Sequence, residues 1–263
     1  MDYDDAYANA PYIPGADDYP GKWQDRAAAF RANARARPDL AYGPHPRQKF
    51  DLFLPEGAAQ GLVVFVHGGY WLKFDRRMWS HLAAGPLAWG WAVAMPSYRL
   101  APEVHIAEIT QDVHKAVAAA AAEVAGPIVM AGHSAGGHLV ARMLCPDVGL
   151  TAEVADRLER VMPISGLSDL RPLIHTAMNG DLRMDLSEAR AESPALCANP
   201  LPVPVIAWVG GAERPVFLDQ SRWLSDAWPQ TELHVEAGRH HFDVIEGLET
   251  PDSHLTRALL DGI

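Results

Sequence analysis

Short apolar runs alternate with helical patterns along most of the chain. Residues 62–66 and 203–209 are apolar on both alternating faces, a pattern that indicates strands covered by helices on both sides. We expect strands within residues 49–55, 62–69, 91–100, 127–132, 160–166, 204–211 and 232–238, and helices within 76–88, 106–124 and 217–227, after Ser134 and near Leu255. This alternation predicts an α/β fold with a doubly wound, mostly parallel sheet.

Two segments depart from this alternation of strands and helices. Residues 1–21 are expected to form an extended arm, and residues 22–36 a helix that packs on the rest and ends before Pro38. We therefore expect an arm and helix over residues 1–41 and one α/β domain over residues 42–263. Within that domain, residues 166–204 mix polar and apolar positions and carry several prolines. A long excursion after a strand usually lies over the carboxyl edge of the sheet, where ligands bind, so these residues predict a short cap insertion.

Composition and net charge narrow the classes of molecule that this protein is expected to bind. The 263 residues carry a formal net charge of -11, which argues against a nucleic-acid groove and against adhesion to an anionic membrane surface. A small-molecule substrate is the expected partner, and the acidic arm with its helix could also serve a homodimer. The acidic, turn-rich first residues lack the pattern of a signal peptide, so we expect a cytoplasmic protein. Cys145 and Cys197 are too few for a disulfide framework and are expected to be buried thiols.

The stretch GHSAGGHL, residues 132–139, contains the first candidate catalytic residue, Ser134. Ser134 follows the expected strand and precedes a helical pattern, so it lies on the strand-to-helix turn that a nucleophilic serine requires. Gly132 and Gly136 permit the close backbone approaches of such a turn. The unpaired N–H groups of the helix start, Ala135 first among them, favour a developing negative charge. A helix cap is the alternative role for this serine.

A second glycine-rich turn, in FVHGGYW, ends the strand at residues 62–66. The backbone N–H groups of Gly68 and Gly69 at this edge are suited to hold an oxyanion together with that of Ala135. Tyr70 and Trp71 stand beside this loop as candidate walls of a substrate pocket, with core packing as the alternative for Trp71. His67 is expected to brace the loop, and Arg99 to pair with a buried acid such as Asp112.

The base and the acid are expected late in the chain, because enzymes with this serine turn place the acid and then the histidine after it. AGRHHFDVI follows the last expected strand and offers His241, with His240 as the alternative. Glu213 follows the strand before it and is the candidate acid that orients the histidine, with Asp219 next. The remaining histidines show no paired metal-ligand spacing, so we expect neither a metal nor a cofactor.

Together these motifs resemble the α/β-hydrolase superfamily, and within it the kynurenine formamidase (arylformamidase) branch related to hormone-sensitive-lipase-type esterases. The resemblance extends from about residue 42 to residue 248 and rests on HGGYW, GHSAGGHL, SGLSDLRPLIHT, SPAL, VGGAERPVF and HHFDVIE, in the family's order. It implies an α/β-hydrolase fold, Ser134 as nucleophile and His241 as base. It also places Glu213 where the family generally has Asp, a departure that leaves the acid open between Glu213 and Asp219.

The resemblance further implies hydrolysis of N-formylkynurenine to kynurenine and formate, often with activity on small aryl or short acyl esters. Two other readings stay open: a short-chain or aryl carboxylesterase without the formamidase step, and a non-catalytic α/β-hydrolase domain used for binding. The sequence does not separate the formamidase from the esterase, because a hydrophobic pocket discriminates poorly among small acyl groups and the decisive contacts are expected in the cap, whose shape the sequence does not give.

Overall fold

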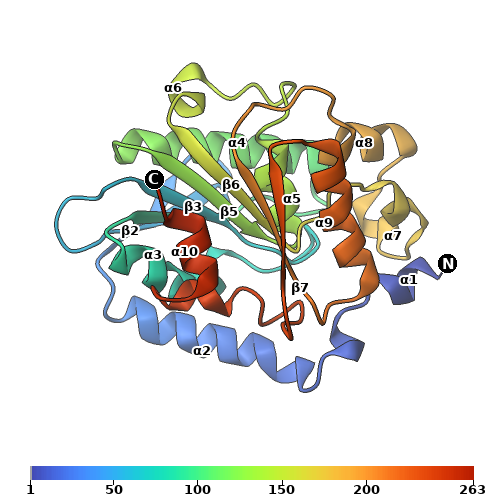
Figure 1. The fold of residues 1–263 in the computed structure, drawn as a ribbon, viewed down its shortest axis with the longest axis horizontal. Coiled ribbons are helices and arrows are strands. Elements are labelled where there is room, and N and C mark those ends of the chain that lie inside the picture. The colour runs from blue at the N-terminus through green and yellow to red at the C-terminus, as the bar shows by residue number, and fades with distance from the viewer. Residues whose placement is uncertain (1) are drawn as a thin grey trace.

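A single twisted sheet forms the centre of the molecule in the computed structural model, which describes residues 2–263 (Figure 1). Its strand order is β1-β2-β4-β3-β5-β6-β7-β8. β2 runs antiparallel to both of its neighbours, while β4, β3 and β5 to β8 run parallel to one another. The strands are β1 (Ala36–Ala41), β2 (Lys49–Phe53), β3 (Leu62–Val66), β4 (Ala92–Pro96), β5 (Ile128–His133), β6 (Leu158–Ile164), β7 (Val205–Gly210) and β8 (Thr231–Glu236). The predicted α/β fold with a mostly parallel sheet is confirmed.

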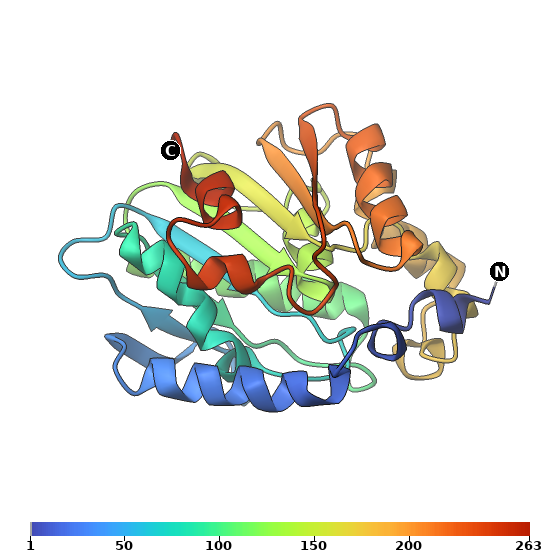
Figure 2. The ribbon, with the colours of Figure 1, turned by 60° about the horizontal axis from the view of Figure 1, so that its bottom comes forward.

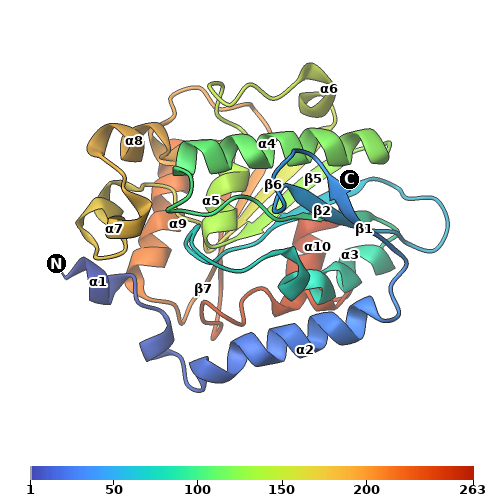
Figure 3. The ribbon, with the colours of Figure 1, turned by 180° about the vertical axis from the view of Figure 1, so that it is seen from behind.

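Helices cover both faces of this sheet (Figures 1 and 3). The helices are α1 (Tyr3–Ala6), α2 (Tyr19–Arg31), α3 (Ala84–Ala88), α4 (Ile106–Glu123), α5 (Ala135–Arg142), α6 (Ala152–Ala155), α7 (Asn179–Leu182), α8 (Leu186–Ala191), α9 (Pro215–Ala227) and α10 (His254–Leu260). Six 3₁₀ turns complete the set: η1 (Ala10–Tyr12), η2 (Ala16–Asp18), η3 (Arg76–Ala83), η4 (Arg171–His175), η5 (Pro194–Leu196) and η6 (Glu246–Glu249). No helix in residues 2–263 is both long enough and apolar enough to cross a membrane.

Two hydrophobic cores lie on opposite faces of the sheet. Strand β3 contributes Val64 to the core shared with α4, α5 and α9, and Val63 to the core shared with η3, α10 and Trp23. Successive side chains of a strand point to opposite faces, so the continuous apolar run of β3 is explained by burial on both sides. The double coverage that the sequence predicts for this run is confirmed.

The amino-terminal segment differs from its prediction. Residues 3–18 form α1, η1 and η2 and are not extended, and α2 begins at Tyr19 and ends at Arg31. Residues 36–41 form β1, which pairs with β2 at the edge of the sheet. The hydrophobic pattern does not predict β1, because an edge strand can expose polar side chains on both faces and can tolerate a proline such as Pro38. The segment therefore supplies a strand of the sheet itself.

The path of this segment brings the start of the chain to the cap region. Figure 2 shows α2 running along the outside of the molecule while the residues before it reach toward the helices that follow β6. α1 contacts η4 of this region. Residues 166–204 lie between β6 and β7 and contain η4, α7, α8 and η5. Two segments from opposite halves of the sequence therefore meet above the carboxyl edge of the parallel strands.

Candidate active site

Ser134 occupies a sharp turn between β5 and α5. Its backbone has φ 55° and ψ -118°, a region that a residue with a side chain adopts only when its surroundings impose it. The two glycines of the motif leave no room for a larger residue. A Cβ on Gly132 would lie 2.2 Å from the carbonyl oxygen of Gly136, and a Cβ on Gly136 would lie 2.0 Å from that of Val66. This backbone presents the hydroxyl of Ser134 above the sheet.

His241 and Glu213 meet beside this turn. Nδ1 of His241 lies 2.6 Å from Oε2 of Glu213, and the two side chains are 4% and 0% exposed. With Nδ1 donating to the carboxylate, Nε2 is the ring nitrogen available to a serine hydroxyl. The ring of His241 is held between Phe217, at 4.3 Å between ring centroids, and His133, at 4.7 Å. The arrangement has the order of partners that general-base activation of a serine requires.

The alternative acid and base lie elsewhere. Asp219 is exposed in α9 and pairs with Arg222 at 3.1 Å. His240 faces the amino-terminal segment, where its Nε2 lies 3.2 Å from the hydroxyl of Tyr19. Its Nδ1 lies 3.2 Å from Asp243. Of the two candidate acids and two candidate bases, Glu213 and His241 are the pair in contact.

The double-glycine loop after β3 lies against the serine turn. A Cβ on Gly68 would lie 3.0 Å from the Cβ of Ser134, so this backbone borders the reacting hydroxyl. Gly69 has φ 111°, and a Cβ there would lie 2.5 Å from the carbonyl oxygen of Lys73. Both positions therefore need glycine. Ala135 is the first residue of α5, so its N–H has no carbonyl partner within the helix and is free to meet an anion.

His67 braces this loop through a hydrogen bond and a ring contact. Its Nδ1–H donates to the carbonyl oxygen of Gly68 at 2.7 Å, and its ring stacks on Tyr98 at 4.4 Å. Burial lowers the pKa of His67 to about 4, so the ring is neutral at pH 7. The predicted bracing role is confirmed. The predicted pair of Arg99 with Asp112 is also confirmed, with two contacts of 2.8 Å.

Two further histidines flank the serine and have structural partners. Nε2–H of His133 donates to the carbonyl oxygen of His241 at 2.9 Å, and Nε2–H of His138 donates to that of Glu192 at 2.7 Å. Burial lowers the pKa of His133 well below its usual value and that of His138 to about 3. Both rings are therefore uncharged and tie the serine turn to the loops around it. In residues 2–263, no three His, Cys, Asp or Glu side chains are grouped closely enough to hold a metal ion.

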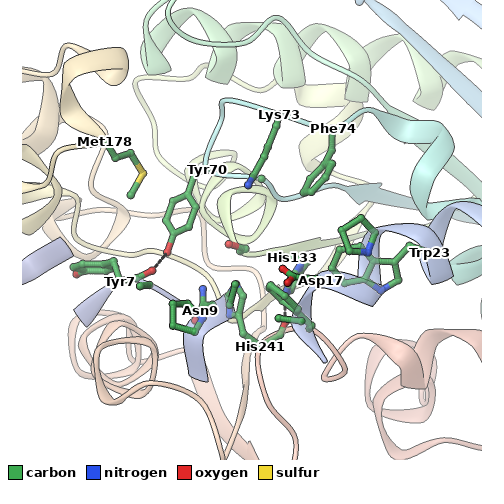
Figure 4. Close-up of a pocket in the computed structure, with 18 of the residues that line it drawn as sticks. Tyr7, Asn9, Asp17, Trp23, Tyr70, Lys73, Phe74, His133, Met178 and His241 are labelled. Atoms are coloured by element: carbon green, nitrogen blue, oxygen red, sulfur yellow. Dashed lines mark hydrogen bonds between the residues drawn. The ribbon is translucent and has the colours of Figure 1, made fainter. Parts of the chain in front are cut away.

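Ser134 and His241 both line a cavity of about 500 Å³, and Figure 4 shows His241 among the side chains that surround it. Its size is within the range that binds a small aromatic molecule. The amino-terminal segment supplies about half of its lining: Asp4, Tyr7, Ala8, Asn9, Ala10, Pro11, Ala16, Asp17, Pro20 and Trp23. The segment between β6 and β7 adds only Thr176 and Met178. The expected cap therefore forms a small part of the wall, and about half of the wall comes from the amino-terminal residues, which were expected to form an extended arm and a packing helix.

Hydrogen bonds fix this amino-terminal wall in place. The hydroxyl of Tyr70 donates to the carbonyl oxygen of Tyr7 at 2.7 Å, the contact drawn in Figure 4. Nε2 of Gln220 donates to the hydroxyl of Tyr7 at 2.9 Å. Arg214 binds the carboxylate of Asp5 at 2.7 Å. The wall is thus attached to the oxyanion loop and to α9, which follows Glu213.

Tyr70 and Trp71 are both expected beside the substrate, but their side chains lie in different surroundings. Tyr70 lines the cavity, whereas Trp71 is 0% exposed, does not line it, and packs edge-on against His138 at 5.1 Å. The substrate-binding role expected for Trp71 is therefore wrong, and core packing is its role. Tyr70 and Trp71 have φ 52° and 58°. Two successive residues in the left-handed region turn the chain, so the two side chains point in different directions.

Comparison with known proteins places the chain among relatives. A family model described as BD-FAE matches residues 50–153. A kynurenine formamidase of Drosophila melanogaster is 31% identical over 241 residues, which cover 84% of this chain and 79% of the relative. The chain belongs to the kynurenine formamidase family. Another member of this family, from Salmo salar, is 27% identical and aligns with 88% of the chain and 83% of its own length. The resemblance found in the sequence motifs is confirmed.

Solved structures share the fold of this chain. A protein of Silicibacter sp. described as a candidate thioesterase is 57% identical, with a TM-score of 0.96, covering 98% of this chain and 99% of its own. Esterase B of Lactobacillus rhamnosis shares the fold, with a TM-score of 0.70, 17% identity and 92% of each chain covered. The kynurenine formamidase family member described here is therefore a hydrolase of the formamidase and esterase kind with the α/β-hydrolase fold.

Proposed function

We propose that this hydrolase removes the formyl group of an aryl formamide, with N-formylkynurenine as its substrate, and that it also cleaves small aryl esters. The observation that carries the proposal is that Ser134 and His241 line one aromatic-rich cavity, with Nδ1 of His241 held by Glu213 outside the lining. The formamidase relatives support the choice of substrate. The aryl part would lie among Trp23, Tyr70 and Phe74 of the cavity wall.

The proposed reaction proceeds in two halves. Nε2 of His241 takes the proton of the Ser134 hydroxyl while the serine oxygen attacks the formyl carbon. The amides of Gly69 and Ala135, with Gly68 beside them, bind the oxygen that becomes negative. Glu213 stabilises the imidazolium through Nδ1. The carbon–nitrogen bond then breaks as the imidazolium returns its proton to the leaving nitrogen, and the aryl amine departs.

Water completes the cycle. His241 takes a proton from the water as it attacks the formyl ester of Ser134. The second tetrahedral intermediate collapses, the serine oxygen recovers its proton from the imidazolium, and formic acid leaves and ionises to formate in water. All of these groups are supplied by the protein, and an ester differs only in having an oxygen as the leaving atom.

The test compares kcat/KM for N-formylkynurenine, p-nitrophenyl acetate and a short acyl thioester on the same preparation. The thioester is included because of the description of the Silicibacter relative. We expect turnover of the formamide and of the aryl ester, and loss of both in Ser134→Ala. Turnover of the esters without the formamide would assign the protein to the carboxylesterases instead.

A further inference from the structure

The end of β6 carries a buried serine that the proposed reaction does not use. Ser165 is 0% exposed and has φ 51°, and its N–H donates to the carbonyl oxygen of Trp208 in β7 at 2.7 Å. A non-glycine residue in this left-handed region costs free energy and persists where its surroundings impose it, often at functional sites. Ser165 also opens the motif SGLSDLRPL, one of those on which the family resemblance rests.

The side chain of Ser165 reaches Glu213. Its hydroxyl donates to Oε1 of Glu213 at 2.5 Å, and the N–H of Gly210 donates to the same oxygen at 2.8 Å. The other oxygen, Oε2, accepts from Nδ1 of His241 at 2.6 Å. Because an ionised carboxylate can only accept, Ser165 is the donor in this contact. Both carboxylate oxygens are therefore held, each from a different side.

The backbone of Gly210 and Arg239 lies close to the carboxylate of Glu213. A Cβ on Gly210 would lie 2.3 Å from the carbonyl oxygen of Arg239 and 3.1 Å from Oε1 of Glu213, so the chain passes close to the carboxylate there. Glutamate has one more rotatable bond than the aspartate common at this position. A longer side chain needs an additional contact to fix the plane of its carboxylate, and the Ser165 hydroxyl supplies it.

We propose that Ser165 is a positioning residue that orients Glu213 toward His241. The inference rests on the proposed role of Glu213 as the acid of the triad, and it does not depend on which acyl group the enzyme removes. Ser165 is absent from the lining of the cavity, so its effect reaches the substrate only through Glu213 and His241.

The first test replaces Ser165 with alanine. Loss of a hydrogen bond to a charged group should lower kcat about 10- to 100-fold, while KM for the same substrate changes less than about twofold, because no substrate contact is lost. Ser165→Cys keeps a weaker donor of similar shape and should recover part of the loss. Ser165→Gly accepts the left-handed backbone without strain but lacks the hydroxyl, so it should lose as much kcat as the alanine variant and serves if that variant does not fold.

The decisive test is a double-mutant cycle with Glu213→Gln. If Ser165 acts through Glu213, adding Ser165→Ala to Glu213→Gln should lower kcat by less than about twofold further, since residues that act as one unit are non-additive. Ser221→Ala is the matched control. Ser221 is 4% exposed and donates to the carbonyl oxygen of Phe217 at 3.1 Å, so its loss removes a buried hydroxyl near the site without touching the triad.

The inference is overturned if Ser165→Ala keeps the parent kcat, or if it lowers kcat by the same factor with and without Glu213→Gln. A similar loss of kcat in Ser221→Ala would also contradict it, by tracing the effect to stability alone. Ser134→Ala separates this result from the proposed function. If Ser134→Ala is inactive while Ser165→Ala is unaffected, only the positioning role fails; if Ser134→Ala remains active, the nucleophile itself is wrong.

Discussion

Replacing Glu213 with glutamine tests the charge that the structure places against His241. The substitution keeps the size of the side chain and removes its negative charge. The imidazolium formed during the reaction then loses an opposite charge whose nearest oxygen is 2.6 Å from Nδ1. At roughly 4 Å between charge centres and an effective dielectric constant of about 20, that attraction is about 4 kcal/mol. Each 1.4 kcal/mol corresponds to about tenfold in rate, so kcat should fall by about 10³-fold.

A second effect acts in the same direction. Glutamine can present its amide N–H to Nδ1, which places the ring proton on Nε2 and removes the lone pair that the Ser134 hydroxyl needs. The assay is steady-state hydrolysis of p-nitrophenyl acetate and N-formylkynurenine, with circular dichroism to show that the variant is folded. Asp219→Asn is the matched control, because Asp219 is exposed and pairs with Arg222, and it should keep kcat within about twofold. A large loss in Asp219→Asn with little loss in Glu213→Gln would refute the reasoning and reassign the acid.

Three further outcomes follow from the contacts described. Tyr70→Phe removes the hydrogen bond to the Tyr7 carbonyl; it should raise KM for N-formylkynurenine about fivefold, equivalent to about 1 kcal/mol, and an unchanged KM would count against the amino-terminal wall as a substrate contact. Gly136→Ala should abolish the folded protein in a thermal melt, because its Cβ would lie 2.0 Å from a carbonyl oxygen. The pKa values of His67 and His138 are lowered by burial to about 4 and about 3. Both rings stay neutral in the folded state while the unfolded chain takes up protons below about pH 6.5. Stability should therefore fall between pH 7 and pH 5, by about 2 kcal/mol for each ring, and urea midpoints that do not fall in this range would contradict the burial of neutral rings.

The sequence predicted the parts of this molecule that local pattern determines. The run at Val63 and Val64 is apolar at successive positions, a pattern typical of a short strand buried on both faces. Ser134 lies between a strand and a helix, which a short motif and its flanks reveal. Glu213 and His241 follow the last two strands, and parallel strands bring such positions to one edge of the sheet.

The parts that the sequence did not predict depend on contacts between distant segments. The amino-terminal wall consists of short turns whose place is set by Tyr7 and Asp5 binding Tyr70, Gln220 and Arg214, far along the chain. Tyr7 in a polar stretch was the available signal, because a buried aromatic there must pack against something. The outcome for Trp71 depended on backbone dihedral angles, which residue spacing alone does not encode.

The proposed activation of Ser134 by His241 and Glu213 makes its hydroxyl a reactive nucleophile. Intact-protein mass spectrometry after treatment with a fluorophosphonate probe tests it most directly, because the probe reacts with activated serines. We expect one adduct per chain, its absence in Ser134→Ala and its slower formation in Glu213→Gln. A native protein that takes up no adduct, or a Ser134→Ala variant that is labelled as fast as the parent, would contradict this activation.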